Sequence, residues 1–130
     1  MSSIKKNNKK GSTKAKLLLV VSNDLIRDIF KELFEKNDYY IVAVDTAKDG
    51  FKALNDEYFN IVICDFDLYD STGVEFFESV KDIRQDRNNI LMVTYGDEAD
   101  ISNVKKLNIR HILEKPFPFE ELINIVKQLT

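Results

Sequence analysis

Short runs of apolar residues alternate along this chain with segments in which apolar residues recur every three or four positions. An uninterrupted apolar run is typical of a strand buried on both faces, whereas the wider spacing is typical of a helix with one buried face. The runs lie at residues 17–21, 39–44, 61–64, 90–93 and 111–113, and the helical patterns at 25–34, 49–58, 74–83, 101–107 and 122–129. Five such alternations predict an α/β protein with a parallel sheet covered on both faces.

Polar residues stand where four of the predicted strands end. They are Asp65 after the third run, Ser22 and Asn23 after the first, Thr94 after the fourth and Lys115 after the last. Because the carboxyl ends of parallel strands gather at one edge of a sheet, we expect these side chains to converge, with Asp65 exposed. The set suits capture of a phosphoryl group, with Asp65 as nucleophile, Thr94 as hydrogen-bond donor and Lys115 as compensating charge.

Composition and charge narrow the class of protein. A chain of 130 residues with 44% hydrophobic residues is long enough for one globular domain. Its single cysteine, Cys64, excludes an internal disulfide and fits a cytoplasmic protein, and no apolar run approaches the roughly 20 residues of a membrane-spanning helix. The first 16 residues carry six lysines and no acid. We therefore expect residues 1–15 to form a disordered basic leader and 16–130 to form an acidic domain that does not bind nucleic acid.

Four motifs in combination resemble the receiver domain of two-component response regulators, the CheY-like family. Residues 65–73 resemble its phosphoacceptor loop, and residues 47–54 resemble its second helix. Residues 93–94 resemble the end of its fourth strand, and residues 114–117 resemble its lysine motif, in which the Lys-Pro bond is cis. The resemblance covers residues 16–130 and rests on the four motifs together.

This resemblance implies a flavodoxin-like (βα)5 fold, a three-layer sandwich around a five-stranded parallel sheet of order 2-1-3-4-5. It implies that Asp65 accepts a phosphoryl group from a histidine kinase or phosphotransfer protein, and that the domain is a signalling module and not an enzyme. Phosphorylation would shift a conformational equilibrium. A downstream protein or a second copy of the chain would read that shift on the face of the fourth helix, fifth strand and fifth helix, without a nucleic acid or a membrane.

The two adjacent acids with which the family holds Mg²⁺ are absent. If the pair directly follows the apolar run it falls on Ser22 and Asn23, whereas counting back from Arg27 places it on Val21 and Ser22. Neither register supplies a carboxylate, so Asp65 is left nearly alone as an acidic metal ligand. We expect Mg²⁺ binding to be weak or absent and unassisted phosphoryl transfer to be slow.

Two neighbouring acids bear on this loss. Asp24 follows the missing pair and is interpreted as the cap of the first helix, in preference to a metal ligand. Asp67 stands where the family uses a backbone carbonyl as metal ligand, and its carboxylate either reaches a cation or repels an incoming phosphate.

Further departures surround the predicted site. Tyr95 follows Thr94 where the family has a small residue, so its ring is expected to restrict access to the acceptor. Tyr69 replaces the usual proline, and Ile112 holds the position of a switching aromatic residue. His111, the only histidine, is interpreted as a surface residue.

Two functions therefore stay open. The chain is either a working receiver, phosphorylated on Asp65 with weakened Mg²⁺ dependence, or a pseudo-receiver that binds proteins without phosphorylation. A flavin-binding enzyme of similar topology is disfavoured, because the first strand is not followed by the Gly- or Ser/Thr-rich loop that a flavin phosphate needs.

Overall fold

Five strands and the helices between them alternate in the computed structural model, which describes residues 14–84, 86–94 and 106–130. Along the chain they are β1 (Lys16–Val20), α2 (Asp24–Lys36), β2 (Tyr40–Val44), α3 (Ala47–Asp56), β3 (Ile61–Asp65), α4 (Gly73–Ser79), β4 (Asn88–Val93), β5 (Ile109–Glu114) and α5 (Phe119–Gln128). Each predicted strand is present, and each of its bounds differs from the prediction by at most two residues.

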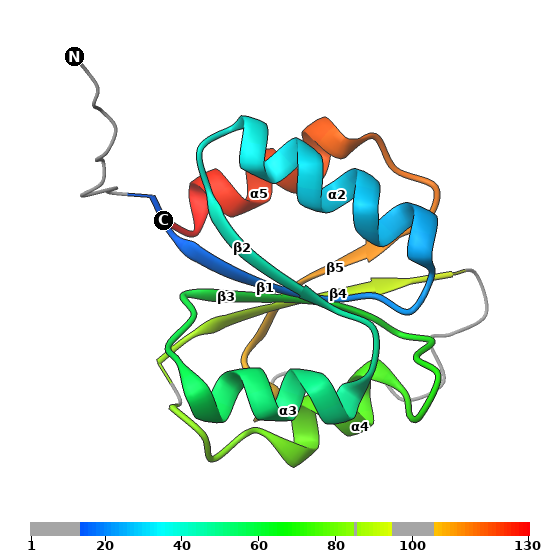
Figure 1. The fold of residues 1–130 in the computed structure, drawn as a ribbon, viewed down its shortest axis with the longest axis vertical. Helices are drawn as coiled ribbons and strands as arrows, with labels where there is room; N and C mark the ends of the chain where they lie inside the picture. Colours follow the sequence, from blue (N-terminus) through cyan, green and yellow to red (C-terminus); the bar gives the residue numbers. More distant parts are fainter. Residues whose placement is uncertain (1–13, 85, 95–105) are drawn as a thin grey trace.

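The strands form one parallel sheet in the order β2-β1-β3-β4-β5, which confirms the predicted flavodoxin-like topology. Helices α2 and α5 cover one face of the sheet, and α3 and α4 cover the other (Figure 1). The carboxyl ends of all five strands therefore point to the same edge, where the connecting loops form the site.

Each face of the sheet has its own hydrophobic core. Alternate residues of β3 divide between them, because successive side chains of a strand point to opposite faces. Ile61 and Ile63 pack on the α2 and α5 side, while Val62 and Cys64 pack on the α3 and α4 side. Cys64 is fully buried and burial raises the pKa of its thiol well above the ordinary value, as fits a structural cysteine.

The predicted helix at 74–83 is shorter in the structure. It begins at Gly73, where Thr72 and Glu75 form a capping box, and ends at Ser79. Val80 and Ile83 continue the helical spacing but lie in the turns that follow. The prediction was wrong at this end because periodicity carries no information about what binds the last carbonyls of a helix.

Several predictions fall on residues that the structure does not describe. These are the basic leader up to residue 13, Tyr95, and the helical pattern at 101–107 apart from its last two residues. Of those two, Leu107 is buried in the core on the α3 and α4 side. No helix in the described ranges is long and apolar enough to cross a membrane.

Candidate functional site

Asp65 is the last residue of β3 and pairs with Lys115. The Lys115 ammonium lies 2.7 Å from Asp65 Oδ1, and Asp65 is only 7% exposed. The expectation of an exposed carboxylate was therefore wrong. Strand β3 is still within the sheet at Asp65, because Asp65 itself pairs in register with Met92 of β4.

Lys115 reaches Asp65 from the loop that follows β5. Its backbone N–H donates to the Val93 carbonyl over 2.8 Å, which extends the pairing of β4 and β5 by one residue. The next peptide bond, Lys115–Pro116, is cis, as the resemblance implies. Phe117 then packs against Phe30 of α2, with ring centroids 6.3 Å apart. The lysine is thus fixed between a strand end and an aromatic contact.

A pocket opens beside this ion pair. Asp65 and Lys115 line it together with Asn23, and its other walls are apolar, from Ile26, Phe30, Met92, Pro116 and Phe117. Sequence motifs indicated the charged residues but not these walls, because the walls come from three separate segments.

Burial raises the pKa of Asp65 above its ordinary value. The hydrogen bond and the charge of Lys115 oppose this shift, while the negative charge of Asp67 adds to it. The net effect is a raised pKa, so the ionised carboxylate is less stable in the fold than in water. Lys115 therefore only partly offsets the cost of burying this carboxylate.

The raised pKa gives Asp65→Asn a predicted effect on stability. Since the folded-state pKa exceeds the unfolded one, stability is lost as pH rises through the folded pKa. Asparagine does not ionise, so Asp65→Asn should be more stable than wild type at neutral pH, with an advantage that shrinks as wild-type Asp65 protonates in acid. Urea unfolding of both proteins over a pH series measures this.

Asp56→Asn, at the exposed end of α3, controls for loss of a surface charge in that series. If Asp65→Asn is less stable than wild type at neutral pH, the attraction of Lys115 exceeds the cost of burying the carboxylate.

Several hydrogen bonds hold the loop that follows Asp65. Gly73 N–H donates to the Phe66 carbonyl over 2.7 Å. The Asp70 carboxylate accepts from the N–H groups of Ala47 and Lys48 at 2.9 and 3.0 Å, at the beginning of α3. Slight burial raises the pKa of Asp70, but these backbone hydrogen bonds lower it more, so its pKa lies below the ordinary value. No sequence pattern indicated this role of Asp70.

The structure assigns a different role to each residue of the β1–α2 connection. Val21 is fully buried in the core, and Ser22 is 5% exposed and hydrogen bonded on both sides. Asn23 is the N-cap of α2 and accepts from Ile26 N–H over 2.9 Å. The expectation that Asp24 caps the helix was wrong, because Asp24 is the first helical residue and pairs with Arg27 at 2.7 Å.

Thr94 follows β4, two residues beyond Met92, the register partner of Asp65. It therefore stands at the same edge of the sheet as the ion pair, although it does not line the pocket that Asp65 and Lys115 share. Thr94 is exposed, and Asp67 is exposed as well. The structure thus brings Asp65 and Lys115 into contact and places Thr94 at their edge of the sheet.

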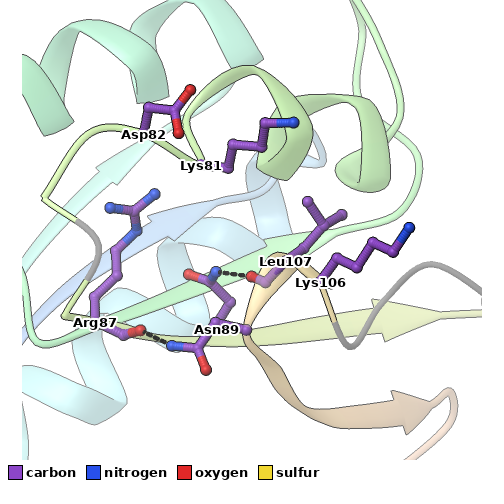
Figure 2. Close-up of a pocket in the computed structure, with 7 residues that line it drawn as sticks. Lys81, Asp82, Arg87, Asn89, Lys106 and Leu107 are labelled. Atoms are coloured by element: carbon purple, nitrogen blue, oxygen red, sulfur yellow. Dashed lines mark hydrogen bonds between the residues drawn. The ribbon is translucent and has the colours of Figure 1, made fainter.

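A second pocket lies near the opposite end of β4, where Arg87 precedes the strand. Lys81, Asp82, Arg87, Asn89, Lys106, Leu107 and Asn108 line it. Figure 2 shows the Arg87 guanidinium extending toward the segment that carries Lys81 and Asp82, and the Asn89 amide donating to the Leu107 carbonyl over 2.7 Å. Arg87 is 3% exposed and donates to the carbonyls of Val80, Ile83 and Arg84. This arginine therefore holds the turns that follow α4, a role that no sequence pattern indicated.

Comparison with known proteins identifies the family. The model of the response regulator receiver domain matches residues 17–127. The chain therefore belongs to the receiver domain family of response regulators. Members of this family are in general non-enzymatic signalling modules that bind Mg²⁺ and interact with histidine kinases or phosphotransfer proteins and with effector partners.

Curated relatives share about a quarter of their residues with this chain. Sporulation initiation phosphotransferase F of Bacillus subtilis is 26% identical over 113 residues, which cover 87% of this chain and 91% of the relative. Transcriptional regulatory protein CrdR of Helicobacter pylori is 25% identical over 114 residues, which cover 87% of this chain and 54% of CrdR. The chain thus spans about half the length of CrdR.

Solved receiver domains share the fold. The response regulator receiver domain protein from Clostridium thermocellum superposes with a TM-score of 0.81 at 19% identity, covering 88% of this chain and 93% of the other. The signal receiver domain of a LuxO repressor protein from Vibrio parahaemolyticus gives 0.79 at 20% identity, covering 89% of each chain.

Proposed function

We propose that this receiver domain takes up a phosphoryl group on Asp65 from a histidine kinase or phosphotransfer protein. The observation that carries the proposal is the contact of 2.7 Å between the Asp65 carboxylate and Lys115 at the edge of a parallel sheet where ligands gather. A carboxylate oxygen attacks phosphorus, a new O–P bond forms, and the P–N bond to the donor histidine breaks.

Three residues have distinct roles in this proposal. Asp65 is the nucleophile in its ionised form. Lys115 offsets the negative charge that the phosphoryl group brings, and the Thr94 hydroxyl donates a hydrogen bond to a phosphoryl oxygen. Wild-type acceptor activity should decline in acid, since a raised pKa extends the pH range in which Asp65 is protonated.

The residues near Asp65 fit a Mg²⁺ ion poorly. When Mg²⁺ is bound in a receiver it neutralises charge on the phosphoryl oxygens. In this chain the side-chain oxygens of Ser22 and Asn23 already take part in hydrogen bonds, which leaves Asp65 and the Asp67 carbonyl as ligands. The described ranges contain no group of three acidic, His or Cys side chains that would hold a metal. These observations support a weak or absent Mg²⁺ dependence.

An apolar surface next to Asp65 is suited to the phosphodonor protein. Leu25, Ile26 and Ile29 on α2 are 68%, 37% and 40% exposed, and Ile26 also lines the pocket at Asp65. A donor must bring its phosphohistidine within bonding distance of Asp65, so it must cover the surface around the pocket. Burial of these side chains would favour the complex.

We place the output surface on residues 101–107, β5 and α5, as the family resemblance suggests. A downstream protein or a second copy of the chain would bind there. The aromatic switching residue of the family is replaced by Ile112, which is half-buried against the core on the α3 and α4 side. This replacement supports a coupling between the phosphorylation site and the output surface that uses movements of the backbone and of aliphatic side chains.

The alternative is a pseudo-receiver that binds its partner without phosphorylation. The observation that favours it is the absence of any carboxylate at positions 21 to 23, together with the engaged oxygens of Ser22 and Asn23. On this alternative the ion pair of Asp65 and Lys115 is structural.

Intact-protein mass spectrometry distinguishes these functions. Wild type is incubated with acetyl phosphate, or with a phosphorylated histidine phosphotransfer domain, each in Mg²⁺ and in EDTA. We expect one phosphoryl adduct, slow from acetyl phosphate and little changed by EDTA, that is lost in Asp65→Ala and kept in Asp67→Asn. No adduct from either donor would establish the pseudo-receiver. An adduct that persists in Asp65→Ala would show that Asp65 is not the acceptor.

A further inference from the structure

We propose that Ser22 is a positioning residue for Asp65. Its hydroxyl holds the phosphoacceptor loop by hydrogen bonds, without a metal ion. The inference rests on the proposed function. The Ser22 hydroxyl donates to the Asp45 carbonyl over 2.6 Å and accepts from Tyr69 N–H over 2.9 Å. One side chain thus joins the loops that follow β1, β2 and β3.

The Ser22 end of this bridge is rigid. The Arg27 guanidinium donates to the carbonyls of Val21 and Ser22 at 2.9 and 3.3 Å, and Asn23 caps α2. Ser22 itself is 5% exposed, so water competes little for its hydroxyl. The loop of residues 66–72 is therefore anchored to a fixed point, and its second anchor is the Asp70 carboxylate at the beginning of α3.

A hydroxyl is the group that this position needs. The bridge uses one donor and one acceptor on the same atom, and a serine hydroxyl provides both. Alanine provides neither. An ionised aspartate has only acceptors, so its oxygens would face the Asp45 carbonyl with no hydrogen between them. Ser22 belongs to the missing acidic pair in either alignment, so this chain has a neutral bridge where the family has a charged metal ligand.

Tyr69 is the complementary departure from the family sequence. A proline there has no N–H group, whereas Tyr69 supplies the N–H that Ser22 accepts. The Tyr69 residue is 69% exposed, so its ring contributes little to the core. Its backbone donor, and not its ring, is the part that the bridge uses. Ser22 and Tyr69, the two departures from the family sequence, are distant along the chain but form one hydrogen bond with each other.

Amide hydrogen exchange measured by NMR in EDTA tests the bridge independently of phosphorylation. We expect Tyr69 N–H to be protected in wild type and equally protected in Mg²⁺. Ser22→Ala should speed its exchange about five- to tenfold, the factor expected for one lost hydrogen bond. Asn23→Ala is the matched control, because it removes a hydrogen bond of the same kind but exposes Ile26 N–H instead. Rapid exchange of Tyr69 N–H in wild type, or protection only with Mg²⁺, would overturn the bridge.

Rates of Asp65 phosphorylation in EDTA test the positioning role. Ser22→Ala and Tyr69→Pro should each slow phosphorylation about tenfold, and the double variant should be no slower than either, because both remove the same hydrogen bond. Tyr69→Ala keeps the N–H and should react at the wild-type rate. Additive effects, or a wild-type rate for Ser22→Ala, would overturn the role. If wild type forms no adduct, the proposed function fails, and the exchange experiment alone decides the bridge.

Discussion

Replacing Arg87 with methionine is expected to lower the free energy of unfolding by about 3 kcal/mol. Arg87 is 3% exposed, and its guanidinium donates to the carbonyls of Val80, Ile83 and Arg84. Methionine keeps much of the apolar volume but leaves three carbonyls in the turns after α4 without this donor. In a buried ion pair both charged side chains can be replaced together. The acceptors here are backbone carbonyls, so they stay in place when the Arg87 charge is removed.

One effect opposes that loss. Burial lowers the pKa of Arg87, although the nearby charge of Asp86 partly offsets the shift. Burying the cation therefore costs free energy, and methionine removes this cost. Because three charge-assisted hydrogen bonds exceed that gain, we still expect a net loss of about 3 kcal/mol.

Urea unfolding of matched variants measures this effect. Arg84→Met, three residues away and exposed, should change the free energy of unfolding by less than about 0.5 kcal/mol. Arg87→Lys should fall between wild type and Arg87→Met, since an ammonium lacks the planar fork that reaches several carbonyls. A loss below about 1 kcal/mol in Arg87→Met would show that water replaces the guanidinium at the end of α4.

The end of α4 shows where sequence patterns stop being informative. Val80 and Ile83 keep the helical spacing, so the pattern alone predicts a helix that runs to residue 83. The guanidinium of Arg87 instead binds the carbonyls beyond Ser79 and stabilises a turn. Arg84 then adopts a φ of 47°. The strands were predictable because burial on both faces needs an uninterrupted apolar run.

The position of the site was predictable, but its local contacts were not. A strand end locates Asp65, and topology brings Lys115 to it. The bonds from Ser22 to Asp45 and Tyr69 join residues 23 and 47 positions apart, and no periodic pattern encodes such pairs. The burial of Asp65 was missed for a similar reason, because the pocket beside it is lined by side chains from α2, β4 and the loop after β5.

The structure also bears on the two alignments that the sequence leaves open for the family's acidic pair. Asn23 caps α2, and aspartate caps helices about equally well, so an acid at position 23 would serve the same local role. Val21 is fully buried in the core and offers no room for a charge. Ser22 is common to both registers and faces the loops. If Mg²⁺ binding is weak or absent as proposed, a carboxylate ligand would have to be introduced at Ser22, where it would break the proposed hydrogen-bond bridge.

Gly73→Ala is expected to lower the free energy of unfolding by about 3 kcal/mol and to displace the end of β3. A Cβ at position 73 would lie 2.5 Å from the Asp65 carbonyl oxygen and 2.7 Å from Leu91 Cδ1. The Gly73 N–H also donates to the Phe66 carbonyl over 2.7 Å, which holds the two segments together. The backbone of Asp65 would have to move, so the proposed phosphorylation of Asp65 should slow as well.

Gly50→Ala is the matched control for Gly73→Ala. Its Cβ would lie 2.9 Å from the Phe76 ring and 3.2 Å from Val20 Cγ2, so its nearest contacts are two side chains and no backbone atom. Alanine also stabilises a helix interior by about 1 kcal/mol relative to glycine, so the net change should stay within about 1 kcal/mol. Thermal unfolding with circular dichroism measures both variants. Equal stability of Gly73→Ala and wild type would mean that α4 does not approach the Asp65 carbonyl this closely. The loop of residues 66–72 would then be free to shift without cost to β3.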